Sequence, residues 1–172
     1  QSLHGARGGV DQERRAERLR TMPKLLIVDD QRNMRTTLAM MLRGAGFEVE
    51  EAQTGEEGAD RGAAGAYDLV LTDLRMGSKD GIDVLRAIKE AQPLTEVIVM
   101  TAYGTIESAV EAMRVGAFDY IQKPFSEQEL IVKVSKAFES RRLHGQVQLF
   151  AQEFKERYHL EKIIGRSQSI RD

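Results

Sequence analysis

A small set of side chains in this sequence has the chemical types and positions needed for phosphoryl transfer to a carboxylate. Asp29 and Asp30 follow one short apolar run, and Asp73 follows another. Thr101 and Lys123 follow two further apolar runs. Carboxylate oxygens are ligands for hard divalent cations, and a small open site of this kind suits Mg²⁺. Because a carboxylate can attack a phosphoryl group to form an acyl phosphate, we identify Asp73 as the candidate acceptor.

Each candidate has a role that follows from its charge. Carboxylates gathered at one sheet edge repel each other unless a cation or protons relieve them. Mg²⁺ held by the Asp29–Asp30 pair and Asp73 would screen that repulsion and hold an anionic phosphoryl group for in-line attack. Lys123 could pair with the phosphate, and Thr101 could donate its hydroxyl to a phosphate oxygen. The bond from Lys123 to Pro124 is a candidate cis peptide, which would aim the lysine inward.

Taken singly, these residues also have purely structural interpretations. Asp30 could serve only as the N-cap of a following helix. Thr101 could fill a strand end, Lys123 could be a solvated lysine, and Tyr120 could be a core or rim aromatic. Their joint occurrence favours a site, because every expected strand end facing one crevice carries a suitable residue except the end of the edge strand.

The elements that must position these residues are indicated by hydrophobic patterning. Continuous apolar runs predict strands covered on both faces, as in parallel sheets, whereas alternation predicts a half-exposed edge strand. Apolar residues at helical spacing, capping-box pairs and terminal glycines predict the helices between them. The expected strands are 24–28, 47–50 (alternating), 69–73, 97–101 and 118–121, and the expected helices contain Met34 to Leu42, Thr54 to Ala64, Ile82 to Ile88, Ile106 to Met113 and Leu130 to Phe138.

Strands and helices therefore alternate five times along the chain. This order predicts an α/β fold, a (βα)5 doubly wound parallel sheet with right-handed crossovers. The expected strand order is 2-1-3-4-5, as in flavodoxin-like folds, with the topological switch point between strands 1 and 3. Asp29, Asp30 and Asp73 would meet at that point, from opposite sides of the crevice.

Composition divides the chain into unequal parts. The expected parts are an N-terminal extension (1–21), a folded domain (22–140), a helical linker (141–162) and the start of a further domain (163–172). The extension is charged and poor in large apolar residues, which suits a solvated helix or a disordered segment. Nothing in the sequence after about Ser140 stops the last helix, so we expect it to continue into the linker.

The linker carries a short apolar seam. Its members have the 4-3-4 spacing of a and d positions in a coiled coil: Leu143, Val147, Phe150 and Phe154. Gly145 weakens this helix. Two heptads are marginal in water, so pairing of two copies would need help from the domain before them.

Bulk properties exclude several classes of protein. The 172 residues have a formal net charge of -2, which gives no reason to expect non-specific nucleic-acid binding. The absence of cysteine excludes disulfides and thiolate metal sites. Apolar runs are too short to cross a bilayer, and the N-terminus lacks the apolar region of a signal peptide. We therefore expect a cytoplasmic protein without a membrane partner.

The strand-end residues resemble those of the receiver domain of two-component response regulators, over about residues 23–140. The resemblance implies that Asp73 is phosphorylated by a sensor histidine kinase. It also implies that Asp30, Asp73 and the main-chain carbonyl of Arg75 hold Mg²⁺, with Asp29 acting partly through water. One departure is Gly77, where the family usually has proline after Met76, and the glycine leaves that loop freer.

The same resemblance assigns roles to the residues on the last two strands. Thr101 and Tyr120 would form the switch pair, and Lys123 would contact the phosphate. Phosphorylation would draw the Thr101 hydroxyl inward and let Tyr120 pack into the vacated space. The face built from the fourth helix, the fifth strand and the fifth helix would then change shape and alter how two copies pair.

Three less specific motifs are similar to those of the NtrC-type, sigma-54-dependent activators. They are 102–113, 116–120 and, resembling the opening of an AAA+ ATPase domain, 164–167. This similarity implies a homodimer, and a longer protein that binds DNA and sigma-54 RNA polymerase through domains outside this sequence. The chain itself would not be an enzyme beyond slow loss of its own phosphate.

Other functions are compatible with an aspartate nucleophile and Mg²⁺. A phosphatase of the haloacid-dehalogenase type also forms an aspartyl phosphate with Mg²⁺, but its nucleophile lies in a D-x-D pattern after strand 1. Here strand 1 is followed by Asp29-Asp30-Gln31. A plain scaffold module and a stand-alone phosphorelay receiver are further alternatives, although the long helical tail argues against the last.

Overall fold

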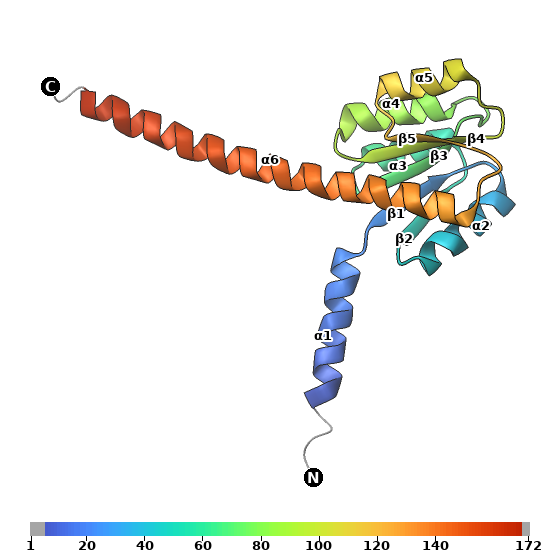
Figure 1. The fold of residues 1–172 in the computed structure, drawn as a ribbon, viewed down its shortest axis with the longest axis horizontal. Helices are drawn as coiled ribbons and strands as arrows, with labels where there is room; N and C mark the ends of the chain where they lie inside the picture. Colours follow the sequence, from blue (N-terminus) through green and yellow to red (C-terminus); the bar gives the residue numbers. More distant parts are fainter. Residues whose placement is uncertain (1–5, 170–172) are drawn as a thin grey trace, which may run out of the picture.

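A five-stranded parallel sheet carries the candidate residues at one of its edges (Figure 1). The computed structural model describes the backbone of residues 6–169 and the side chains of residues 9–17 and 22–157. The strands are β1 (Lys24–Val28), β2 (Glu48–Ala52), β3 (Leu69–Asp73), β4 (Glu96–Thr101) and β5 (Asp119–Gln122). Their order is β2-β1-β3-β4-β5 with parallel pairing throughout. The predicted fold class and strand order are therefore confirmed.

Helices cover both faces of this sheet. They are α2 (Arg32–Gly44), α3 (Gly55–Ala63), α4 (Gly81–Ala91), α5 (Ile106–Val115) and α6 (Glu127–Ser169), and α1 (Ala6–Thr21) precedes the sheet. One buried cluster joins α2 and the start of α6 to one face, and a second joins α3, α4 and α5 to the other. This three-layer arrangement follows from the patterning, because strands that are apolar on both sides need cover on both sides.

The strand sequences match their positions in the sheet. The four apolar residues of β1 and all of β3 and β4 are buried, while β2 at the edge exposes Glu48 and buries Val49. The predicted edge strand is therefore correct in place, although it starts at Glu48 and extends to Ala52. Charged side chains on an edge strand discourage pairing with other chains.

Capping fixes where two of the helices begin. The Thr54 side chain accepts a hydrogen bond from the Glu57 N–H at 3.1 Å, as predicted. The Glu57 carboxylate, however, accepts from the Gln53 N–H rather than from Thr54, so the reciprocal half of the box is shifted by one residue. At the start of α6, Ser126 Oγ accepts from the Glu129 N–H at 3.1 Å. These bonds satisfy amide groups that the first turn of a helix leaves without partners.

Helix α5 forms where its apolar spacing predicts it, but its large apolar residues face solvent. Ile106, Val110 and Met113 are 85%, 49% and 49% exposed, whereas the small Ala112 is the buried contact with the sheet. Periodicity identifies a helix without showing which side the protein covers. Here it marks an uncovered apolar face.

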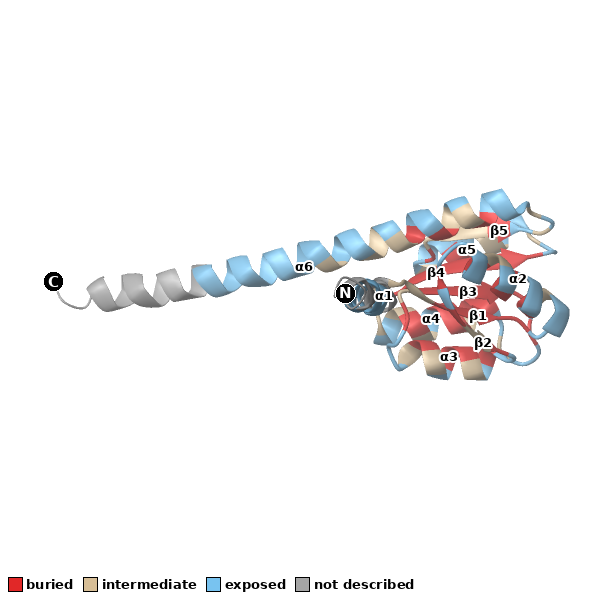
Figure 2. Ribbon diagram, turned by 90° about the horizontal axis from the view of Figure 1, so that it is seen from below, coloured by how far each residue is buried: buried red, intermediate tan, exposed pale blue. Residues whose placement is uncertain are grey.

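Helix α6 leaves the domain as one long helix (Figure 2). Leu130 and Val134 are fully buried, and Phe138 is partly buried against the same cluster. The predicted seam lies beyond the sheet, and its members are 48–73% exposed: Leu143, Val147, Phe150 and Phe154. The helix continues to Ser169 through the boundary expected at 163, and the side chains after residue 157 lie outside the described part.

The N-terminal segment forms helix α1, one of the two alternatives expected for it. Its described side chains, 9–17, are all exposed, in keeping with their charge. Residues 1–5 lie outside the described part of the chain. Among the described helices, none combines the length and apolar character required to traverse a lipid bilayer.

Candidate functional site

The carboxyl edge of the sheet brings the three predicted carboxylates together. Asp29 follows β1, Asp73 ends β3, and one oxygen from each of Asp29, Asp30 and Asp73 lies within 4.8 Å of the others. Asp29 and Asp73 are buried, while Asp30 is exposed. The strands β1 and β3 are direct neighbours with helices on opposite faces, so this is the crevice expected at the topological switch point.

An ammonium group faces this cluster from the end of β5. Lys123 Nζ lies 3.3 Å from Asp29 Oδ2 and 3.7 Å from Asp73 Oδ1, and its side chain is 10% exposed. The Lys123 main-chain N–H donates to the Thr101 carbonyl at 2.8 Å, which holds the lysine beside β4. The bond from Lys123 to Pro124 is cis, as expected. One cation therefore faces two buried anions, and the exposed Asp30 belongs to the same acidic cluster.

Burial raises the pKa of the Asp73 carboxyl above its ordinary value, and the neighbouring Asp29 and Asp30 charges raise it further. Lys123 and a hydrogen bond from the Leu74 N–H to Asp73 Oδ1, 2.9 Å long, act in the opposite direction. The raised pKa means that the lysine does not fully compensate the cost of the Asp73 charge. A further cation would relieve it.

The donor set fits Mg²⁺. All three side chains offer hard oxygen ligands, and no nitrogen or sulfur ligand takes part in this cluster of the described residues. The exposed Asp30 leaves one side open to solvent, as an ion that retains water molecules requires. The Arg75 carbonyl, which the family resemblance adds to the ligands, follows Asp73 by two residues and remains a prediction.

The turn after β1 is fixed by its own hydrogen bonds. Asp29 Oδ1 accepts from the Gln31 N–H at 2.9 Å. Gln31 is the N-cap of α2 and supplies no side-chain cap, so Asp30 is not the cap that the structural alternative required. The exposed Asp30 carboxylate thus has no capping role and is available to a ligand.

Arg35 was not identified from the sequence, although this residue of α2 forms a hydrogen bond with the turn. Its guanidinium is buried, and Nη1 donates to the Asp29 carbonyl at 2.9 Å. The sequence does contain a signal for it: Arg35 has the i, i+3, i+4, i+7 spacing of a helix face with Leu38, Ala39 and Leu42, which are the other buried residues of α2. This spacing places an arginine at a position of the helix where an apolar residue is expected.

Thr101 and Tyr120 lie on the adjacent strands β4 and β5, and Gly104 lies close to both side chains. Thr101 is 1% exposed, and its Oγ1 accepts from the Tyr103 N–H at 3.0 Å. The partly buried Tyr120 hydroxyl lies 3.0 Å from Ser108 Oγ in the first turn of α5. A Cβ added at Gly104 would lie 2.6 Å from Tyr120 Oη and 3.1 Å from Thr101 Cγ2. Gly104 thus lies close to both residues and Ser108 contacts Tyr120, although the sequence analysis singled out neither of them.

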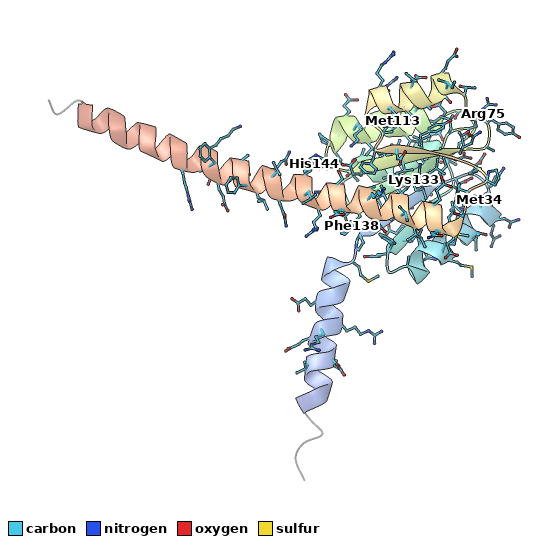
Figure 3. All side chains as sticks on the ribbon, viewed as in Figure 1. Met34, Arg75, Met113, Lys133, Phe138 and His144 are labelled. Carbon is cyan, nitrogen blue, oxygen red and sulfur yellow. The ribbon has the colours of Figure 1, made fainter. Side chains whose placement is uncertain are left out.

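The loop after β3 contacts the loop after β4. The Arg75 guanidinium lies over the Tyr103 ring, 5.2 Å from its centroid, and Figure 3 shows Arg75 on this loop. Gly77, at the place where the family usually has proline, has a φ of +50°. This is the left-handed region that proline cannot adopt, so the glycine is accompanied by a different loop conformation.

Comparison with known proteins agrees with this geometry. Residues 25–135 match the model of the response regulator receiver domain. The transcriptional regulatory protein ZraR of Klebsiella oxytoca is 40% identical over 119 residues, 69% of this chain and 27% of that protein. Regulatory protein AtoC of Escherichia coli is 36% identical over 149 residues, 87% of this chain and 32% of its own length. The chain thus spans less than half the length of these curated relatives.

Solved structures give the same result. A response regulator receiver domain protein from Clostridium thermocellum superposes with a TM-score of 0.68 at 32% identity, covering 71% of this chain and 98% of that one. The beryllofluoride-activated NtrC4 receiver domain dimer superposes with a TM-score of 0.66 at 30% identity, covering 70% and 99%. The family model covers more than half of the chain and includes the predicted acidic residues, Thr101, Tyr120 and Lys123, whereas the predicted seam on α6 lies beyond it. This protein therefore belongs to the response regulator receiver domain family.

Proposed function

We propose that the chain receives a phosphoryl group on Asp73 from a sensor histidine kinase, with Mg²⁺ bound by Asp29, Asp30 and Asp73. The observation that carries this proposal is the convergence of three carboxylates within 4.8 Å, with Lys123 Nζ facing two of them at 3.3 and 3.7 Å. Bound Mg²⁺ would supply positive charge to the transferring phosphoryl group.

In the proposed transfer, an Asp73 carboxylate oxygen attacks phosphorus while the bond from phosphorus to the kinase imidazole nitrogen breaks. The electron pair of that bond returns to the imidazole. Because Lys123 is already near Asp73 and largely shielded from solvent, its ammonium can follow the phosphoryl oxygens with little reorganisation. Thr101 lies at the end of the adjacent strand β4, from which its hydroxyl can donate to a phosphoryl oxygen.

The proposed output is a change in how two copies pair. A Thr101 hydroxyl that turns to the phosphate gives up the bond from the Tyr103 N–H, and Tyr120 then adjusts beside it. The same movement reaches α5 because the Tyr120 hydroxyl contacts Ser108. Helix α5 carries an exposed apolar face, and α6 carries the exposed seam, so both offer surface to a second copy.

We further propose that the chain is the receiver of a cytoplasmic, NtrC-type, sigma-54-dependent activator. The matches to ZraR and AtoC support this subclass, as does the α6 helix that continues beyond the sheet. In that case DNA and sigma-54 RNA polymerase would be partners of further domains. A stand-alone phosphorelay receiver would lack such domains.

Treatment with acetyl phosphate and Mg²⁺ tests the acceptor directly. We expect one acid-labile phosphate per chain, lost on adding EDTA beforehand and absent from Asp73→Asn. The Asp68→Asn variant is the matched control, because Asp68 is an acidic residue at the opposite end of β3 and should not affect labelling. Labelling that survives Asp73→Asn would refute the assignment, and multiple turnovers of p-nitrophenyl phosphate would instead favour a phosphatase.

Light scattering after gel filtration, with and without beryllofluoride and Mg²⁺, tests the output. We expect the mass or the dimer geometry to change, and the change to be lost in a variant that carries Phe150→Ser and Phe154→Ser. Val10→Ser is a suitable control, since Val10 is an exposed apolar residue on α1 rather than on α6. An unchanged mass and shape would contradict the coupling.

A further inference from the structure

A buried guanidinium lies directly beneath the acidic turn. Arg35 is 7% exposed and occupies the side of α2 that otherwise packs Leu38 and Leu42 against the sheet. Burying a cation is costly unless its partners are well placed. A helix that needed only to cover the sheet would be served by an apolar residue here. The position of Arg35 therefore calls for a role that packing alone does not explain.

The contacts of Arg35 connect three elements. Nη1 donates to the main-chain carbonyl of Asp29, 2.9 Å away, just beyond the end of β1. Nε lies 3.6 Å from Glu51 Oε1 on β2 and has no hydrogen-bond partner, so its interaction with Glu51 is a loose ion pair. The short contact is thus the one to the backbone of a predicted metal ligand.

Asp29 is held at four points by the described residues. Its N–H donates to the Ala52 carbonyl at 3.2 Å, and its Oδ1 accepts from the Gln31 N–H. Its Oδ2 faces Lys123, and its carbonyl accepts from Arg35. Three of these partners come from the strand edge or from the turn itself. Among the described residues, only Arg35 forms a hydrogen bond with the peptide that joins Asp29 to Asp30.

We propose that Arg35 is a positioning residue for the cation site: it fixes the peptide between Asp29 and Asp30 so that both carboxylates converge on Asp73. This inference rests on the proposed function, since it concerns the Mg²⁺ that those residues would hold. The positive charge of Arg35 opposes a nearby cation, whereas its hydrogen bond favours the ligand geometry. We infer that the geometric effect exceeds the electrostatic one.

The two effects predict opposite outcomes when Arg35 is replaced. Arg35→Lys keeps the charge and loses the planar donor, and Arg35→Met removes both while retaining an unbranched, although shorter, side chain. If positioning dominates, both variants bind Mg²⁺ more weakly, by about ten-fold or more, the usual effect of losing a group that orients a ligand. If charge dominates, Arg35→Met binds Mg²⁺ more tightly than the native protein.

Arg43 provides a matched control on the same helix. Its Nη2 also donates to a strand carbonyl, that of Val49 at 2.9 Å, and lies 3.8 Å from Glu51 Oε2. It does not contact the Asp29 turn. Isothermal titration of the whole chain with MgCl2 should therefore give Arg43→Met a dissociation constant within about two-fold of the native one, as for a residue remote from the ligands.

Amide hydrogen exchange in EDTA gives a second measurement that needs no metal. The Gln31 N–H donates to Asp29 Oδ1, so its protection reports the order of the turn. We expect faster exchange at Gln31 in both Arg35 variants and no change in Arg43→Met. This measurement also covers the case in which an Arg35 variant is less stable, because the loss of protection should be local to the turn.

The outcomes separate the two proposals. A native chain that takes up no Mg²⁺ would refute the proposed function. A native chain that binds Mg²⁺, with Arg35 variants that bind it equally well or more tightly, would overturn only the role of Arg35. The same conclusion would follow if Arg43→Met lost as much affinity as the Arg35 variants.

Discussion

Replacing the candidate acceptor by its neutral isostere should stabilise the metal-free protein. In Asp73→Asn the side-chain carbonyl can still accept the hydrogen bond from the Leu74 N–H, which is 2.9 Å long in the native structure. Lys123 keeps its closer partner, Asp29, at 3.3 Å. The substitution therefore removes a buried charge without removing the contacts that order the strand end.

The magnitude follows from the distances. At an effective dielectric constant of about 20, attraction between Lys123 and Asp73 across 3.7 Å amounts to about 4.5 kcal/mol. Repulsion from Asp29 across at most 4.8 Å amounts to at least about 3.5 kcal/mol, and Asp30 adds to it. The repulsion from the two carboxylates is at least as large as the attraction to Lys123, so the desolvation cost of the ion, several kcal/mol when complete, is left uncompensated. We expect Asp73→Asn to gain about 1–3 kcal/mol in free energy of unfolding at neutral pH.

The gain should depend on pH. The pKa of Asp73 is raised on folding from an ordinary value of 3.8, so the native protein loses stability as the pH rises through the folded pKa. Below 3.8 the carboxyl is protonated in both states and the cost is absent. The advantage of Asp73→Asn should therefore be largest at neutral pH and shrink as the pH falls toward that value.

Urea unfolding in EDTA, followed by circular dichroism at neutral pH and at mildly acidic pH, measures this difference. Asp68→Asn is the control, because the Asp68 carboxylate accepts a bond from the Lys24 N–H at 2.9 Å and lies away from the acidic cluster. It should lose stability, not gain it. A loss in Asp73→Asn, or a gain that does not change with pH, would show that the charges at the site are balanced and that the reasoning is wrong.

Two further predictions concern the packing of α3 and the edge strand β2. A Cβ on Gly58 would lie 2.5 Å from a Val28 methyl group, whereas a Cβ on Gly44 would have no atom within 4 Å. In urea unfolding, Gly58→Ala should therefore be less stable than Gly44→Ala by about 1–3 kcal/mol. Equal effects of the two substitutions would contradict the packing of α3 on β1. The Tyr67 hydroxyl donates to Glu50 and lowers its pKa below 4.5, so the native protein should lose this contribution as the pH falls through the lowered pKa. Tyr67→Phe should flatten that loss in acid unfolding curves, and an unchanged curve would contradict the assignment.

The fold could be predicted because nearly every buried strand residue is apolar and nearly every connection carries a helix or turn signal. The runs ending at Val28, Asp73 and Thr101 are continuous, which only a sheet covered on both faces can accommodate. Once the strand order was known, the topology alone placed Asp29 and Asp73 on neighbouring strand ends. The acidic cluster thus follows from chain order and chemistry together.

The functional residues that the sequence did not predict are those whose contacts are with other helices, strands or loops. Arg35 looks like one of many charged helix residues until the helix is docked on the sheet. Ser108 and Gly104 become relevant only when Tyr120 is placed beside them. Helix α5 was predicted but its orientation was not, since periodicity does not say which face a domain leaves uncovered.

Among the helices α2 to α5, which cover the sheet, the packing of α5 identifies it as the one that should move most easily. Of its residues only Ala112 is buried, whereas α4 buries Gly81 and four large apolar or branched residues. A helix held by little buried surface costs less to shift or open. Its first turn nevertheless contacts Tyr120 through Ser108, beside the strand that ends at Thr101. We therefore expect a change at the acidic cluster to reach α5 without disturbing the core, and to alter the exposed apolar face that α5 would offer to a second copy.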